Sequence, residues 1–124
     1  MLEIGFEKVE DIGFLKLRGS VDGENYEMFH ASASGLLDQG VSRIVLDLKE
    51  VDYIVSSGFR TIGSCVSGAK DMGGGLVIMS PTDGVREILQ LLGFHNLLSI
   101  VATKEEAVKY FYPEGLPAEK DGDA

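Results

Sequence analysis

The stretch RIVLDLKEVDYIVSSGFRTIGSCVSGA, residues 43–69, shows how the chain is organised. Its apolar run at residues 44–48 is interrupted only by Asp47, which is typical of a strand covered on both faces. Farther along, small and apolar residues recur every three or four positions and predict one buried stripe of a helix: Gly58, Ile62, Cys65, Ala69 and Met72. Ser56 and Ser57 therefore lie where that helix begins, at the carboxyl edge of a parallel strand. Open α/β sheets place functional groups at this edge.

The remaining segments predict the other elements of a single α/β domain. Alternating apolar residues from Leu2, a break at residues 10–13 and a second extended run from Phe14 indicate an antiparallel N-terminal hairpin. Further strands are expected at residues 76–79 and 97–101. We expect a mixed sheet, antiparallel in the hairpin and largely parallel in the remainder, packed with about four α-helices.

Helix signals flank these strands. Asp22 is placed to cap a helix that runs from Glu24 to about Gly40, or to lie just before it. Ser80 is a candidate N-cap with Pro81 at the first helical position, and residues 103–106 form a capping-box pattern. The first of these two helices carries Val85, Ile88, Leu89 and Leu92 on one face, and the second is expected to turn Ala107, Tyr110 and Phe111 inward.

Composition excludes several classes of function. The chain has 11 Lys and Arg against 20 Asp and Glu, and the resulting charge of −9 repels phosphate backbones and anionic lipid. We therefore expect neither direct nucleic-acid binding nor membrane insertion. The N-terminus has no signal-peptide pattern, and the single Cys65 suits a reducing compartment, so a cytoplasmic protein is expected.

The same counts indicate no resident cofactor or metal. The two histidines, His30 and His95, are far apart in sequence, and the acids do not cluster into a recognisable ligand set. The glycines at residues 73–75 lack the lysine of a phosphate-binding loop and are expected to form a turn. Residues 1–112 are predicted to form the domain, and residues 113–124, rich in acids and poor in apolar side chains, a disordered tail.

The two serines have two interpretations. A serine at a helix start commonly caps it, and such a cap contributes about 1 kcal/mol. Two adjacent serines exceed what one cap requires, however, and a hydroxyl at this edge is open to another protein. A phosphoryl group there would add about −2 of charge at a helix N-terminus, which tolerates anions, so the domain would survive the modification.

Two other functions, a serine esterase and a receiver domain phosphorylated on aspartate, fit the sequence less well. A serine esterase is disfavoured because no Gly-x-Ser-x-Gly motif is present, and no enzyme activity is expected. A response-regulator receiver domain would use Asp47, with Glu10, Asp11, Ser80 and Lys104 in a suggestive order. The receiver passes from its acidic pair into a helix, whereas here a strand follows Asp11.

Three groups of residues carry a resemblance to a known family. They are Leu46-Asp47-Leu48 with Val51, Ile54 and Ser56-Ser57-Gly58; Gly19-Ser20-Val21-Asp22; and Pro81 with Val85, Leu89 and Gly93-Phe94. On these residues the chain resembles a STAS domain, the fold of bacterial anti-sigma factor antagonists and of the cytoplasmic tails of sulfate transporters. The resemblance covers residues 2–111.

The resemblance implies a regulatory function. In such antagonists the first loop serine is phosphorylated by an anti-sigma factor that is itself a GHKL-type serine kinase, and a serine phosphatase restores the protein. Carried over by position, the phosphoacceptor is Ser56, with Ser57 as second candidate. The partner-binding surface would comprise Asp22, Ser56, Ser57, Gly58 and Arg60. The unmodified protein would occupy the anti-sigma factor and so regulate transcription.

Two residues depart from the family pattern. Val55 stands where an aspartate is usual, and Arg60 stands where a small residue is common. Arg60 lies one turn into the helix and could pair with a phosphate on Ser56. The missing acid keeps a second hypothesis open, in which the chain is a non-phosphorylated STAS subunit of a transporter or signalling scaffold. Either reading leaves the oligomeric state open.

Overall fold

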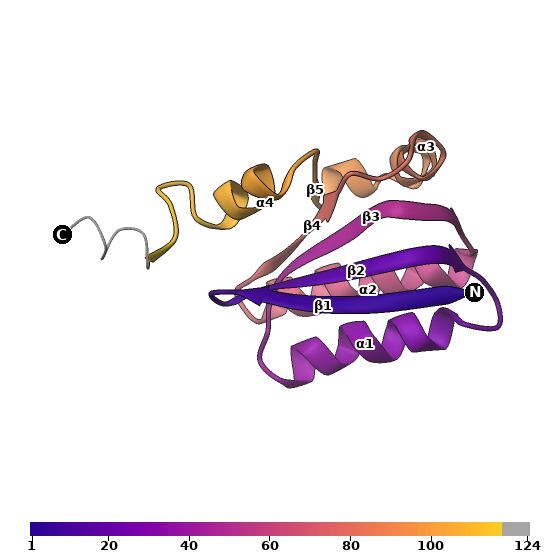
Figure 1. The fold of residues 1–124 in the computed structure, drawn as a ribbon, viewed down its shortest axis with the longest axis horizontal. Helices are drawn as coiled ribbons and strands as arrows, with labels where there is room; N and C mark the ends of the chain where they lie inside the picture. The colour runs from indigo at the N-terminus through magenta and orange to yellow at the C-terminus, as the bar shows by residue number, and fades with distance from the viewer. Residues whose placement is uncertain (118–124) are drawn as a thin grey trace.

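The computed structural model describes residues 1–117 and contains the predicted series of strands and helices (Figure 1). In chain order these are β1 (Leu2–Val9), β2 (Ile12–Val21), α1 (Tyr26–Asp38), β3 (Arg43–Ile54), α2 (Ser56–Asp71), β4 (Gly75–Met79), α3 (Asp83–Leu91), the 3-10 turn η1 (Phe94–Asn96), β5 (Ser99–Val101) and α4 (Lys104–Phe111).

The five strands form one mixed sheet in the order β1-β2-β3-β4-β5. β1 and β2 are an antiparallel hairpin, and β2, β3, β4 and β5 are parallel neighbours. The predicted α/β class and mixed sheet are therefore confirmed. Each parallel pair is joined by a helical crossover, so the carboxyl ends of β2, β3 and β4 meet at one edge.

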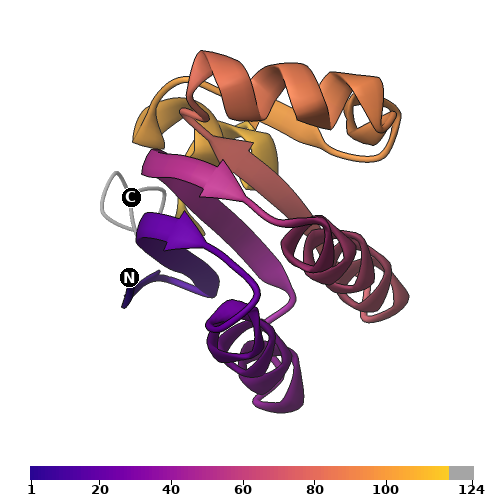
Figure 2. The same ribbon diagram turned by 90° about the vertical axis from the view of Figure 1, so that its right-hand side faces the viewer.

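Helices cover both faces of the sheet. α1 and α2 lie side by side on one face (Figure 2), and with α3 they enclose the larger core around Leu17, Leu46 and Ile62. α4 closes a smaller cluster on the other face, which includes Val45 and Val77. The alternate residues of β3 thus enter two different cores. This explains why its first half is almost wholly apolar.

Four residues that the helical spacing placed on an apolar helix face are exposed, and they include Tyr110, which was expected to face inward: Met72, Ile88, Leu92 and Tyr110. The other members of the α2 stripe, Ile62, Cys65 and Ala69, are buried as predicted. Met72 follows the last residue of α2, where the chain turns away. α3 lies at the border of its layer, so one side of its apolar face is left without a neighbour.

The N-terminal cap of α3 differs from the prediction. Ser80 is not the N-cap of α3: its φ is +53°, and its hydroxyl donates to the Ala102 carbonyl at 2.6 Å. Thr82 caps the helix instead, because its Oγ1 accepts from the Val85 N–H at 3.4 Å. The capping residue predicted for α4 is confirmed, with Thr103 Oγ1 accepting from Glu106 N–H at 3.1 Å.

The C-terminal segment is described as far as residue 117. Leu116 packs against the smaller core, and Tyr112 is hydrogen-bonded to Asp11 and to Arg43, so this segment is tied to the β1–β2 turn. Residues 118–124 of the expected tail lie outside the described residues. The domain boundary at residue 112 and the disorder beyond it stay predictions.

Candidate functional site

The connection between β3 and α2 is a single residue, Val55. Its backbone is extended, with φ −71° and ψ 160°, and its N–H donates to the Val21 carbonyl at 2.8 Å. The Val55 carbonyl accepts from the Gly58 N–H, also at 2.8 Å. The start of α2 is thereby fixed to the end of β2, as well as to the strand it follows. Ser56 is the first residue of the helix.

Gly58 lets the helix begin this close to the sheet. A Cβ on Gly58 would lie 2.6 Å from Ile54 Cγ2 and 3.0 Å from Val21 Cγ1, so no larger residue fits without displacing the strand ends. Gly58 is buried and has no side chain to present to a partner. Its contribution to the predicted site is to hold Ser56 and Ser57 at the sheet edge.

Neither serine caps α2. The N-cap position is occupied by Val55, and no side-chain hydrogen bond caps the helix. The capping interpretation of the serines is therefore wrong. Within residues 1–117, Ser56 is exposed and its hydroxyl makes no hydrogen bond, whereas Ser57 is half-buried. The physical consequence is a free hydroxyl at the N-terminus of a well-anchored helix.

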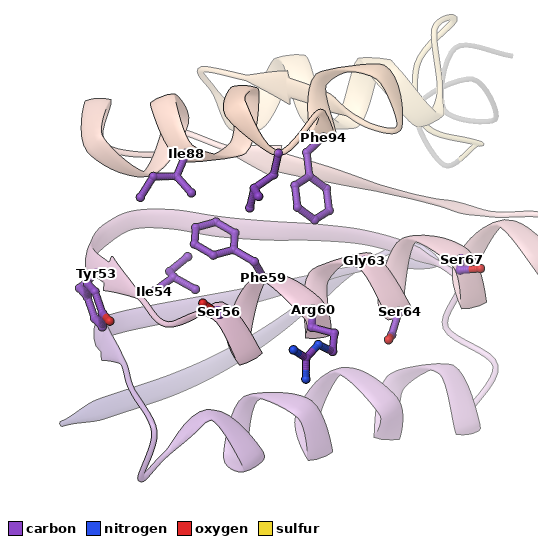
Figure 3. A pocket seen from close by; sticks show the side chains of 11 residues that line it. Tyr53, Ile54, Ser56, Phe59, Arg60, Gly63, Ser64, Ser67, Ile88 and Phe94 are labelled. Atoms are coloured by element: carbon purple, nitrogen blue, oxygen red, sulfur yellow. The ribbon is translucent and has the colours of Figure 1, made fainter.

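Ser56 opens onto a groove between α2 and α3. The groove has a volume of about 770 Å³, and its walls include Tyr53, Phe59, Ile88 and Leu92 (Figure 3). Phe59 and Phe94 meet at its floor with ring centroids 6.4 Å apart. The exposed side chains of Ile88 and Leu92 thus face α2 across this groove. An exposed apolar groove of this kind is typical of an interaction surface.

Ser57 opens onto a different hollow, between α1 and α2. This α1–α2 pocket, of about 310 Å³, is lined by Tyr26, Glu27, His30, Ser57, Arg60, Thr61 and Ser64. Arg60 lines both hollows and, among the described residues that line them, is the only arginine or lysine. It is exposed and makes no ion pair or hydrogen bond through its side chain within residues 1–117.

Asp22 lies at the same edge as the serines. β2 ends at Val21, which is paired with Ile54, so the chain leaves both strands side by side. Asp22 is not the N-cap of α1, a position taken by Asn25, but lies just before that helix. Its Oδ1 accepts from the N–H groups of Glu24 at 2.9 Å and Asn25 at 3.0 Å. Asp22 therefore orders the loop before α1.

The alternative chemistries find no support in this geometry. His30 lines the pocket with Ser57, a juxtaposition the sequence did not reveal, yet no hydrogen bond joins them and no nucleophile–base pair is formed. Asp11 lies at the opposite, N-terminal edge of β2 and pairs with Arg43 at 3.1 Å, far along the strand from the carboxyl edge. The acidic pair of a receiver domain is therefore absent from the position that Asp47 would require.

Residues 1–117 lack two further features, a metal-binding cluster and a membrane-spanning helix. No group of three His, Cys, Asp or Glu side chains is placed to hold a metal ion. No described helix has the length and apolarity needed to span a bilayer. Cys65 is buried, and this burial raises the pKa of its thiol to about 11, which makes it a packing residue.

The loop, the single sheet and the two flanking helices correspond to a known domain. The model of the STAS domain family matches residues 3–107. The chain belongs to the STAS domain family. The predicted family is confirmed, and the match extends from the second residue of β1 to the middle of α4.

Known relatives of this STAS domain include BtrV of Bordetella bronchiseptica, which is named as a candidate anti-sigma factor antagonist. It is 28% identical over 110 residues, which are 89% of this chain and 95% of BtrV. A candidate antagonist from Thermotoga maritima has a solved structure with a TM-score of 0.83, at 24% identity and with 88% of this chain and 94% of that one covered.

Structures of the anti-sigma factor antagonist SpoIIAA are also similar to this STAS domain. The unphosphorylated form has a TM-score of 0.80 at 22% identity, covering 92% of this chain and 100% of that one. The phosphorylated form from Bacillus has a TM-score of 0.72 at 21% identity, covering 87% and 98%. At these identities the structural likeness shows the shared fold alone.

Proposed function

We propose that this STAS domain is an anti-sigma factor antagonist, a protein-binding module that phosphorylation of Ser56 switches off. Its partner would be an anti-sigma factor with GHKL-type serine kinase activity, and a serine phosphatase would reset it. The unmodified module sequesters the anti-sigma factor and thereby frees a sigma factor for transcription in the cytoplasm. The module is the substrate of the kinase and has no catalytic residue of its own.

One observation carries this proposal: Ser56 has an exposed hydroxyl without a structural task. A capping serine would be bonded to the helix backbone, but this one is not. It lies beside the apolar α2–α3 groove, so a partner bound in that groove reaches the hydroxyl. The names of relatives such as BtrV support the same class of partner.

The phosphorylation step needs only the kinase and ATP. Ser56 Oγ forms a bond to the γ-phosphorus, the bond from that phosphorus to the bridging oxygen breaks, and ADP leaves. The hydroxyl proton passes to a base of the kinase. Val55 replaces the usual acid beside this hydroxyl. The charged residues nearby include Arg60, which lines the groove with Ser56, and Asp22, which follows the end of β2 at the same sheet edge.

The added charge would release the partner without unfolding the module. At the N-terminus of α2 a phosphate is stabilised by the helix dipole, so the fold tolerates it. In a closed interface the same group loses its water. Arg60, which lines the groove with Ser56, offers one positive charge against about two negative charges, so part of the phosphate charge is buried unpaired, which costs several kcal/mol. At 1.4 kcal/mol per tenfold in affinity, this cost is sufficient for a switch.

The direct test is incubation with the cognate kinase and ATP, followed by mapping of phosphate by mass spectrometry. We expect the phosphate on Ser56, and we expect a Ser56→Asp variant to bind the kinase at least about tenfold more weakly than Ser56→Ala. Ser67→Asp, at the far end of the same groove, is the matched control for added charge. Absence of phosphate from Ser56, or equal binding by the Asp and Ala variants, would refute the switch.

Val55 favours one second candidate, a STAS subunit of a transporter or signalling scaffold that is never phosphorylated. In that case the α2–α3 groove would bind its partner permanently. Affinity purification separates the two proposals, because a membrane transporter recovered without a GHKL-type kinase would support the second. A Val55→Asp variant that gains phosphate on Ser56, where the natural protein gains none, would point the same way.

A further inference from the structure

The two serines at the start of α2 are directed to different surroundings. Ser56 lines the apolar α2–α3 groove, and Ser57 lines the polar α1–α2 pocket. Consecutive residues of a helix are separated by about 100° around its axis, which accounts for the difference. A phosphoryl group on Ser56 would therefore face mainly apolar walls with Arg60 as their one cation, whereas one on Ser57 would face Arg60 together with His30, Tyr26 and Glu27.

The α1–α2 pocket carries the groups that bind phosphate. Arg60 supplies a guanidinium, His30 an imidazole, and Tyr26 and Ser64 supply hydroxyl donors, while Glu27 opposes an anion. The Arg60 side chain points from α2 toward α1 (Figure 3). It makes no ion pair or hydrogen bond within the described chain, so its charge is available. Arginine is the side chain best suited to bidentate phosphate binding.

The backbone at the start of α2 adds to this potential. The N–H groups of Ser56 and Ser57 have no acceptor within residues 1–117. Unsatisfied N–H groups concentrate the positive end of the helix dipole where the pocket opens. The start of the helix, at Ser57, and the Arg60 side chain thus both contribute to the wall of the same pocket.

We propose that the α1–α2 pocket is a phosphate-binding site that holds a phosphoryl group carried by Ser57, with Arg60 as its principal ligand. The proposal rests on the proposed function only in that an ATP-dependent serine kinase supplies the group. Ser57 Oγ bonds to the γ-phosphorus, ADP leaves, and the hydroxyl proton passes to the kinase. A phosphate on Ser57 is then bound by the protein itself, whereas one on Ser56 stays open to a partner or a phosphatase.

The test places phosphoserine at position 57, or at position 56, during protein synthesis, so that neither kinase nor partner is required. Titration by ³¹P NMR gives the second pKa of each phosphate, which is about 6 for an unperturbed group. We expect the pKa at position 57 to lie at least about half a unit below that at position 56, because a bound cation favours the dianion. Arg60→Gln should remove most of this difference, and Glu27→Gln should lower the pKa at position 57 further.

Arg86→Gln is the matched control, because Arg86 lies on α3 and lines neither hollow. Amide spectra of each variant confirm that it is folded. Equal pKa values at the two positions, or an Arg60→Gln variant that changes both equally, would overturn the proposal. Such a result would leave the Ser56 switch intact, and failure of the Ser56 kinase assay would not affect this titration.

Discussion

At the residue scale, the Ser56 hydroxyl is proposed to have a function but contributes little to the stability of the fold. Because this hydroxyl makes no cap, we predict that Ser56→Ala changes the free energy of unfolding by less than about 0.5 kcal/mol. Thr103→Ala removes a genuine cap and should cost about 1 kcal/mol. Urea denaturation of both variants measures the difference. A Ser56→Ala loss as large as that of Thr103→Ala would contradict the uncapped geometry.

Gly58, in contrast to Ser56, is important for stability, because there is no room for a side chain at its position. The Cβ of Gly58→Ala would press on Ile54 and Val21, and we predict a loss of about 1–3 kcal/mol in the free energy of unfolding. Gly35→Ala is the control, since nothing lies within 4 Å of a Cβ at that helical position. There the better helix propensity of alanine should stabilise the protein by up to about 1 kcal/mol. Equal effects at both glycines would rule out the close approach at Gly58.

At the scale of elements, the segment after α4 is fixed by side chains from two distant parts of the chain. Tyr112 hydrogen-bonds to Asp11 in the β1–β2 turn, and the Arg43 guanidinium lies 4.8 Å from the centre of its ring. The hydrogen bond to Asp11, together with burial and the Asp11 charge, raises the pKa of Tyr112 above its usual value near 10. The phenol is thus held in its protonated form.

This raised pKa predicts a pH dependence of stability. The unfolded chain loses the Tyr112 proton first, near pH 10, so the contribution of this contact is complete below that pH and falls as the pH rises toward the folded pKa. Urea midpoints measured from pH 7 to 11 should therefore fall more steeply for the natural protein than for Tyr112→Phe. The other tyrosines are present in both proteins, so their effect on the pH dependence cancels in the comparison. Parallel curves would show that the contact does not persist in solution.

At the scale of the whole molecule, Cys65 reports on global opening. It lies between α2 and the sheet, and its thiol has a pKa of about 11. We predict that a thiol reagent at pH 8 reacts with the folded protein more than about a hundredfold more slowly than with the urea-unfolded chain. The double variant Cys65→Ser with Ser67→Cys moves the thiol to an exposed position of the same helix and should react rapidly. Rapid reaction of natural Cys65 would show that the core opens locally.

The charge of the whole molecule also bears on its partner. With a net charge of −9, the surface repels nucleic acid, and any protein that docks beside Asp22 and Ser56 has to accept an acidic neighbour. An added phosphate would deepen this negative potential around the start of α2, where Arg60 is the one arginine or lysine among the residues that line the two hollows. The switch proposed for Ser56 and the phosphate site proposed for Ser57 differ in the other side chains that line each hollow, which are mainly apolar beside Ser56 and polar or charged beside Ser57.

Much of the fold could be predicted because its signals are local. The alternation from Leu2, the apolar run before Asp47 and the capping box at Thr103 each lie within a few consecutive residues, and backbone preferences act over that range. The same holds for the position of Ser56 at a strand-to-helix junction. Residue periodicity could not show which sides of α3 and α4 find a neighbour. It therefore grouped the exposed Ile88 with the buried Val85 and Leu89, and it placed Tyr110 inward wrongly.

The amino-acid sequence by itself determined the order of strands and helices, the family resemblance and the edge at which two serines lie. Only the tertiary structure decided that Ser56 faces an apolar groove, that Ser57 shares a pocket with His30 and Arg60, and that Gly58 is packed against two strand ends. The physical reason is the distance along the chain over which each feature is determined. Periodicity and helix caps depend on residues that are neighbours in sequence. A hollow is set by whichever distant side chains the packed helices bring to its walls.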